Sequence, residues 1–183
     1  MNEEQVNEKE IKVPFAYDIA SIFYTALVVI MVIFTFVFRF VGVVGDSMNP
    51  TLNNNDWLLV RAVNTEYHQG DIIISTQPNS FNEPIVKRVI ATGGQTVNIN
   101  FVTGDVYVDG KLLEEDYIAE PTKTRQDVSF PVKVPEGKLF VLGDNRNDST
   151  DSRSTAVGML DERYIIGKVV FRILPIADFE YFR

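Results

Sequence analysis

The sequence predicts a mainly β protein in which a single N-terminal transmembrane helix precedes an all-β domain built as folded sheets or a barrel. One supporting observation is an apolar run from Ile19 to Val44, in which all but five of the 26 residues are apolar. The other is a series of short segments after Gly45 that are rich in β-branched and aromatic residues and are separated by turn residues. This second part shows no convincing helical period.

Whole-chain composition describes an average globular protein, with 45% apolar residues and a mean hydropathy of +0.01 over 183 residues. The net charge of −8 and the pI of about 4.7 argue against a nucleic-acid partner, because such proteins neutralise phosphates with basic residues. The absence of cysteine excludes disulfides, thiolate metal sites and cysteine nucleophiles. A single histidine, His68, excludes sites that need two, and its polar loop predicts a solvated side chain.

The apolar run is long enough to cross a membrane as a helix. The 20 residues from Ile19 to Phe38 carry no charge, and at 1.5 Å per residue they cover the ~30 Å hydrocarbon core. A buried core helix is the first alternative, but the remaining chain is too small to surround it. A cleaved signal peptide is the second, but its apolar region is about 7–15 residues. We therefore predict an uncleaved anchor over residues 19–41.

The predicted orientation follows from the sizes of the flanking parts. Lys9 and Lys12 precede the span, and Arg39 and Arg61 follow it. The positive-inside rule therefore gives little preference for either orientation. The tail of residues 1–18 is easier to leave in the cytoplasm than a folded domain. We expect this tail to lie on the cytoplasmic side of the cell membrane and the domain over residues 42–183 to lie on the outer side.

The exported part reads as a succession of strands. Asp109-Gly110 predicts a type I′ hairpin, and residues 93–137 are expected to form a β-rich insert that includes a solvated acidic loop, Glu114-Glu115-Asp116. The predicted strands are Trp57–Val63, Ile72–Thr76, Ile85–Ile90, Val97–Phe101, Val106–Val108, Val128–Val134, Lys138–Leu142 and Tyr164–Leu174.

Lys87 is a candidate base. With no cysteine and one histidine, a nucleophile could be served by a neutral lysine, whose pKa burial can lower by about 3–5 units. Alternation places Lys87 on one strand face with Ile85 and Val89, and Arg88 on the other. One of these two cations therefore points the same way as apolar side chains. The alternative is an edge-strand lysine that blunts aggregation, and this feature alone favours the alternative.

Ser47 is a candidate nucleophile, in a turn directly after the apolar run. Gly45 permits close backbone approach and Pro50 sets the next bend. Such a turn can present a hydroxyl and leave backbone N–H groups free to bind an oxyanion. The alternative is an ordinary turn at a domain boundary.

A third feature is the polar stretch from Gly143 to Arg153, which follows an apolar strand. It fails as an EF-hand calcium loop because Arg146 stands where the second carboxylate should be. A structural network of Asp and Arg pairs is the better interpretation. We find no metal-ligand spacing and no cofactor motif, and no signal for an oligomeric state.

Together these features resemble the signature boxes of type I signal peptidases, peptidase family S26, in order, in spacing and in the anchor before the serine. The lack of further spans and the small domain resemble the Gram-positive branch. The matching boxes are Ser47-Met48-x-Pro50-Thr51-Leu52, Gly70-Asp71-Ile72-Ile73, Lys87-Arg88-Val89-Ile90 and Gly143-Asp144-Asn145-Arg146-x-x-Ser149-x-Asp151-Ser152-Arg153.

The resemblance implies a Ser/Lys dyad in a mostly β fold. Ser47 would be the nucleophile, and Lys87 the general base that later activates the deacylating water. The backbone N–H of Ser47 would serve the oxyanion hole. Some relatives add a hydroxyl side chain two residues earlier, where this chain has Gly45, so that donor must be missing or replaced.

The resemblance also implies supporting roles in the last box. Ser149 would hydrogen-bond the lysine amine and orient it. Asp151 with Arg153 and Arg146, together with Asp144, would hold the region together.

Substrates implied by the resemblance are exported preproteins with small residues at positions −1 and −3, cleaved beside the lipid bilayer. An extended peptide would add as a strand between Pro84–Lys87 and the segment leading into Ser47. The side chains expected to line its pockets are Val43, Met48, Ile85 and Val86.

Two other functions compete with this interpretation. A self-cleaving or regulatory Ser/Lys peptidase would usually carry a DNA-binding domain and not an anchor. A non-enzymatic or specialised scaffold for surface protein assembly would be favoured by loss of the serine or the lysine, and both are present here.

Overall fold

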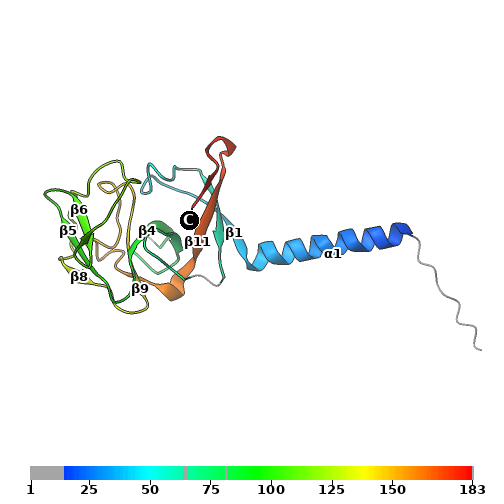
Figure 1. The fold of residues 1–183 in the computed structure, drawn as a ribbon, viewed down its shortest axis with the longest axis horizontal. Coiled ribbons are helices and arrows are strands. Elements are labelled where there is room, and N and C mark those ends of the chain that lie inside the picture. Colours follow the sequence, from blue (N-terminus) through cyan, green and yellow to red (C-terminus); the bar gives the residue numbers. More distant parts are fainter. Residues whose placement is uncertain (1–14, 64–65, 81, 183) are drawn as a thin grey trace, which may run out of the picture.

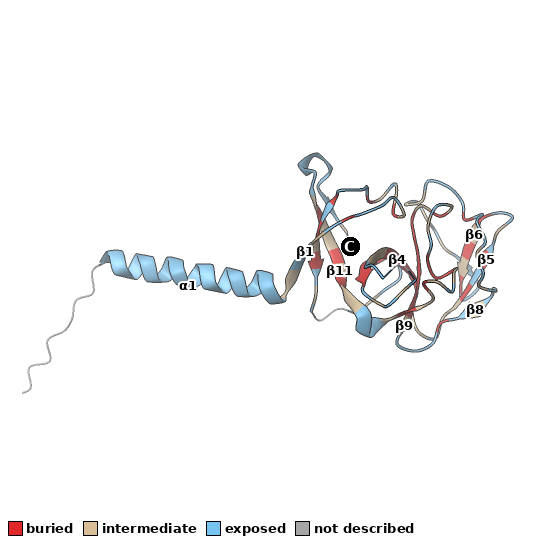
Figure 2. Cartoon of the chain, turned by 180° about the vertical axis from the view of Figure 1, so that it is seen from behind, coloured by how far each residue is buried: buried red, intermediate tan, exposed pale blue. Residues whose placement is uncertain are grey.

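A computed structural model describes residues 15–63, 66–80 and 82–182 of the chain. One helix, α1 (Phe15–Phe36), projects away from a β domain, and all of its residues are exposed (Figures 1 and 2). By length and composition it could cross a membrane, and it is the sole helix of this kind in the described ranges. The mainly β class with one N-terminal apolar helix is thus confirmed.

The helix does not coincide with the predicted span. It begins four residues before Ile19, and after Phe36 the chain turns into a strand, β1 (Phe38–Gly42). β1 pairs antiparallel with β2 (Trp57–Arg61), which supplies its backbone groups with partners outside the helix. Apart from Arg39 and Gly42 these residues are apolar, like most of the helix, so composition hid the boundary. Residues 1–14 of the predicted tail lie outside the described part.

The larger sheet is antiparallel and eight-stranded. Its order is β1-β2-β11-β3-β4-β9-β10, and β12 also pairs with β11. Two short 3₁₀ helices, η1 (Glu162–Tyr164) and η2 (Ile176–Asp178), flank β11. The remaining strands are β3 (Ile72–Ser75), β4 (Ile85–Ala91), β9 (Lys138–Leu142), β10 (Leu160–Asp161), β11 (Ile165–Leu174) and β12 (Glu180–Tyr181).

A smaller sheet lies within residues 93–137, at the end of the domain far from the helix (Figure 1). Its hairpin turn has positive φ at Asp109 (51°) and Gly110 (78°), as a type I′ turn requires. The predicted strand Val128–Val134 is reduced to two residues, because Pro131 has no N–H to donate. The strands, in the order β7-β6-β5-β8, are β5 (Thr96–Asn100), β6 (Asp105–Val108), β7 (Lys111–Leu112) and β8 (Val132–Lys133).

Two buried clusters position the functional segments. One joins the two sheets, with Phe140 and Leu142 of β9 packed among side chains of β4, β5 and β6. The other lies under the turn that follows β1 and contains Met48 and Leu52, which are 1% and 0% exposed. Burying these two side chains fixes the turn that carries Ser47.

Candidate active site

Ser47 lies in a tight turn closed by backbone hydrogen bonds. Asn49 N donates to Asp46 O at 3.1 Å, and Leu52 N donates to Met48 O at 2.9 Å. Gly45 is the first residue of the turn and has a φ of +90°, a backbone conformation that residues other than glycine rarely adopt. Ser47 itself is half-buried, so its hydroxyl remains accessible from one side.

Lys87 lies on β4 with its side chain turned into the protein, and only 4% of the residue is exposed. A solvated edge-strand lysine, the alternative from the sequence, is therefore excluded. Lys87 pairs with Ile73 of β3, whereas the pairing of β4 with β9 begins only at Arg88. Residues Ile85–Lys87 thus leave one edge of β4 open next to the lysine.

The two candidates meet. Lys87 Nζ donates to Ser47 Oγ at 2.7 Å and to Val86 O at 3.0 Å. Burial lowers the pKa of Lys87 from 10.5 to about 8, partly opposed by the carboxylates of Asp151 and Asp144. A neutral amine at this distance can accept the serine proton, which is the geometry a general base needs.

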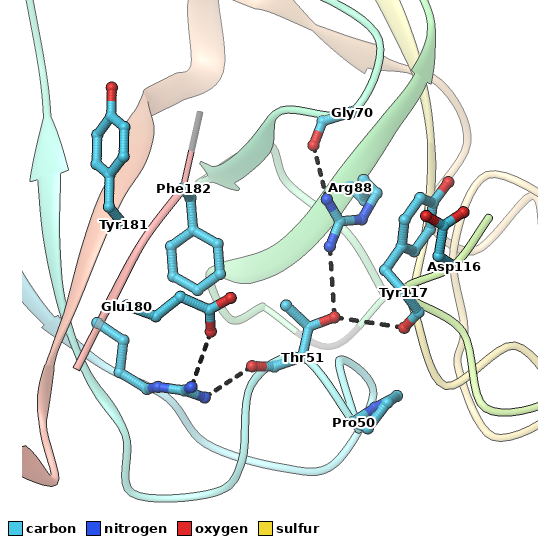
Figure 3. Close-up of a pocket in the computed structure, with 10 residues that line it drawn as sticks. Pro50, Thr51, Gly70, Arg88, Asp116, Tyr117, Glu180, Tyr181 and Phe182 are labelled. Atoms are coloured by element: carbon cyan, nitrogen blue, oxygen red, sulfur yellow. Dashed lines mark hydrogen bonds and ion pairs between the residues drawn. The ribbon is translucent and has the colours of Figure 1, made fainter. Parts of the chain in front are cut away.

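Arg88, the neighbour of the lysine, points to the opposite face of β4 and anchors the surrounding loops. Asp144 accepts from Arg88 Nε at 2.8 Å and Nη2 at 2.6 Å, and from Thr51 Oγ1 at 2.6 Å. Arg88 Nη1 also donates to Gly70 O (Figure 3). This network ties the serine turn to β4 and to the loop after β9. No role was predicted for Arg88 from the sequence, although its position in a strand of alternating apolar residues distinguished it.

Asp151 and Arg153 form a fully buried bidentate pair, with Nε–Oδ1 and Nη2–Oδ2 both at 2.8 Å. Asp151 Oδ2 also accepts from Gly143 N at 3.0 Å. Arg146, expected to help hold this region together, does not pair with Asp151 but donates from Nε to Gly143 O at 3.1 Å. Its guanidinium also meets Glu115, with Nη2–Oε1 at 2.5 Å and Nη1–Oε2 at 2.9 Å.

In the loop predicted to be solvated, Glu114 and Asp116 are exposed as expected, but the side chain of Glu115 is only 7% exposed. Arg146 is fully buried and must find a carboxylate, and the insert supplies it. The acidic segment of the insert thus supports the loop after β9.

A cleft of about 450 Å³ runs from the dyad along the open edge of β4. Of the side chains predicted to line it, Ile85 and Val86 do so. The prediction for Val43 and Met48 is wrong, since both are buried in the cluster beneath the turn. The cleft is lined by Val41, Gly42, Val44, Ser47, Ile74, Glu83, Pro84, Ile85, Val86 and Lys87.

The register of the chain after β1 explains this error. The backbone of Val43 pairs with Asp56 and Asn55, which turns its side chain inward. The next residue, Val44, is 90% exposed and faces the cleft. A shift of one residue in an extended chain exchanges the faces of all side chains.

Comparison with known proteins places this geometry in a family. Residues 16–174 match the family model described as signal peptidase, peptidase S26. The chain belongs to the peptidase S26 family of signal peptidases. It is 37% identical to a signal peptidase I of Bacillus licheniformis over 84% of this chain and 86% of that protein.

Two further relatives cover the chain differently. Signal peptidase I S of Bacillus subtilis is 33% identical over 97% of both chains. A probable signal peptidase I-1 of Synechocystis is 42% identical over 71% of this chain and 68% of that one. The protein is thus a hydrolase of the signal peptidase family, and membership predicts a Ser/Lys dyad, the pair brought together here at 2.7 Å.

In this signal peptidase family member, Ser149 does not contact the lysine as expected. Its Oγ is buried and has no hydrogen-bond partner among the described residues. Lys87 Nζ instead uses Val86 O as its second acceptor. The predicted hydrogen bond from Ser149 to the amine is therefore wrong for this conformation.

Gly143 lies where the loop after β9 touches the serine turn. A Cβ there would stand 2.1 Å from Ser149 Oγ and 2.5 Å from Ser47 O. We expect Gly143→Ala to lower the kcat of precursor cleavage by up to about 10²-fold, because small displacements of a nucleophile are costly. Steady-state kinetics of the full chain would measure this.

The control for Gly143→Ala is Gly110→Ala, in the distant hairpin, where a Cβ meets nothing within 4 Å and the φ of +78° strains only the local turn. It should keep the wild-type kcat. Equal activity in both variants would show that the loop after β9 does not position Ser47.

A second cavity, of about 410 Å³, lies beyond Arg88 (Figure 3). Thr51 and Tyr117 line it together with the C-terminal Glu180 and Phe182. The ring of Tyr117 covers the Arg88 guanidinium at 3.9 Å. The cavity therefore borders the Arg88 network and not the dyad. Over the described residues, no group of three or more His, Cys, Asp or Glu could hold a metal ion.

Proposed function

We propose that this protein is a membrane-anchored serine endopeptidase that removes signal peptides from exported preproteins after small residues at −1 and −3. Ser47 acts as the nucleophile and Lys87 as the general base. The observation that carries the proposal is the 2.7 Å contact between a buried amine and the serine Oγ.

The proposed reaction uses the same amine twice. Neutral Lys87 takes the proton of Ser47 Oγ as the oxygen attacks the scissile carbonyl carbon, and the Ser47 N–H stabilises the resulting oxyanion. The lysine ammonium then gives its proton to the leaving amine, which leaves an acyl-serine and a neutral lysine. Water loses a proton to that lysine, attacks the ester, and the ammonium returns the proton to Ser47 Oγ.

The proposed substrate site is the open edge of β4. An extended peptide can pair with residues 85–87 along the edge that faces away from β3 and lie against the segment from Val41 to Val44. The walls at Ile85, Val86 and Ile74 are apolar, which suits small uncharged side chains next to the scissile bond.

The orientation we propose has the N-terminal tail in the cytoplasm and the β domain outside.

An apolar outer face of β1, β2, β11 and β12 supports bilayer contact beside the helix. Aromatic side chains are typical of the membrane interface. The exposed members of this face, between 42% and 57% accessible, are Phe40, Trp57, Leu174 and Tyr181. Phe179, which precedes β12 and stacks on Phe171 of β11, adds to it.

Incubating the detergent-solubilised full chain with a labelled precursor tests the proposed function. We expect one cut after a small residue, with the site identified by mass spectrometry. A scaffold would leave the precursor intact, and a self-cleaving peptidase would cut its own chain in preference. Either result would contradict the proposal.

The pH dependence of the reaction follows from the lysine. Its pKa is lowered to about 8, and only the neutral amine can act as a base. The kcat/KM for precursor cleavage should therefore rise with pH through about 8 and then level off. His68→Ala should keep the same profile, since this exposed histidine lies away from the cleft. A profile flat between pH 6 and 9 would contradict a lysine base.

A further inference from the structure

The cleft beside the dyad carries a charge that the proposed reaction does not use. Glu83 lines it, two residues before the start of β4, and its side chain is exposed. Apart from Lys87, it is the one charged residue that lines this cleft in the part of the chain that the structure describes. Its carboxylate makes no hydrogen bond or ion pair with the described residues, so it is free to interact with a bound peptide.

Chain direction sets which substrate residue would meet Glu83. The segment from Val41 and the segment from Glu83 both run toward the dyad, ending at Ser47 and Lys87. A peptide whose residue −1 lies at Ser47 and whose upstream residues fill the cleft therefore runs parallel to both.

Strand spacing then fixes the register. Four residues separate Lys87 from Glu83, and at about 3.3 Å per residue this is about 13 Å. A parallel peptide covers the same length with four residues. Residue −5 of the substrate, four before residue −1, comes level with Glu83.

We propose that Glu83 is a specificity-determining residue that disfavours acidic and favours basic side chains at position −5 of the precursor. This rests on the proposed function. The field of Glu83 acts along a cleft whose walls are mostly apolar, which reduces its screening by water. Because the carboxylate is exposed, the preference is modest, about fivefold between lysine and glutamate at −5.

Three precursors that differ only at −5, as lysine, glutamine or glutamate, test this with the full chain in detergent at low ionic strength. Wild-type protein should cleave the lysine form with a kcat/KM about fivefold above the glutamate form. Glu83→Gln should bring this ratio close to one, and Glu83→Lys should invert it. At 1 M salt, where the screening length is about 3 Å, the wild-type ratio should also approach one.

The matched control is Glu114→Gln, which removes the same charge from an exposed position on the insert. It should keep the wild-type ratio and the wild-type rate. A wild-type ratio near one, or a ratio unchanged in both Glu83 variants, would overturn the inference while the glutamine precursor is still cleaved. Failure of wild-type protein to cleave the glutamine precursor would instead overturn the proposed function.

Discussion

Replacing Lys87 by methionine is expected to lower kcat/KM for precursor cleavage by more than about 10³-fold while the fold is kept. Methionine matches the lysine stem in length and is apolar, and only 4% of the lysine is exposed. The substitution therefore removes the base without adding a buried charge. It also removes the donor to Ser47 Oγ, which then has no group nearby to take its proton. Single-turnover cleavage of a labelled precursor would measure the loss.

Four further variants are needed to interpret this result. Ser47→Ala should lose as much activity as Lys87→Met, and the double variant should lose no more, because the two groups act as a unit. Lys87→Arg should also fail, since a guanidinium does not give up its proton at any working pH. Lys133→Met, on the exposed face of β8, is the matched control and should retain full activity. Cleavage by Lys87→Met would refute the dyad.

Neither residue of the dyad was decisive alone, and the sequence identified the pair through the joint resemblance of several segments to the signature boxes of type I signal peptidases. Ser47 lies in a turn with its own glycine and proline, and Lys87 lies in a strand whose alternation is visible locally. The two residues are 40 positions apart in the sequence. They meet because β4, which pairs with β3 in the sheet, lies beside the turn that carries Ser47.

Partners across long separations were not predictable in this way. Arg146 reaches Glu115 in the insert, 31 residues away, where the local sequence indicated only a solvated acidic loop. Of the Asp and Arg pairs expected within the last box, the structure forms the one between Asp151 and Arg153, which are two residues apart. Which acid meets which base depends on how the insert folds back onto β9.

Boundaries within apolar sequence were equally hidden. Residues 37–44 are mostly apolar, like α1, yet they form β1 and part of the wall of the cleft. A strand partner, Trp57–Arg61, decides their conformation, and this partner lies beyond the reach of hydropathy. The same register turns the side chain of Val43 inward and that of Val44 outward. The apolar pattern alone could not predict this, because it does not show where the helix ends and the strand begins.

Replacing Arg153 by methionine is expected to destabilise the protein by about 3–5 kcal/mol, because it leaves the Asp151 carboxylate buried and unpaired. The chain offers an unusually close control in Arg163, which also pairs with the aspartate two residues before it, with Nε–Oδ1 at 2.9 Å and Nη2–Oδ2 at 2.7 Å. The two pairs differ in burial: the Arg153 side chain is 0% exposed and the Arg163 side chain 82%. Arg163→Met should therefore barely change the melting temperature in detergent.

The pH profile separates a structural from an electrostatic role for Arg153. Its positive charge helps to lower the pKa of Lys87, so Arg153→Met should raise that pKa and shift the rise of kcat/KM to higher pH. Loss of fold alone would lower activity at every pH without moving the midpoint. Asp151→Asn combined with Arg153→Met removes both charges, and because Asp151 opposes the lowered pKa, the midpoint should return toward the wild-type value. A midpoint unmoved in both variants would show that this pair holds the loop after β9 without tuning the base.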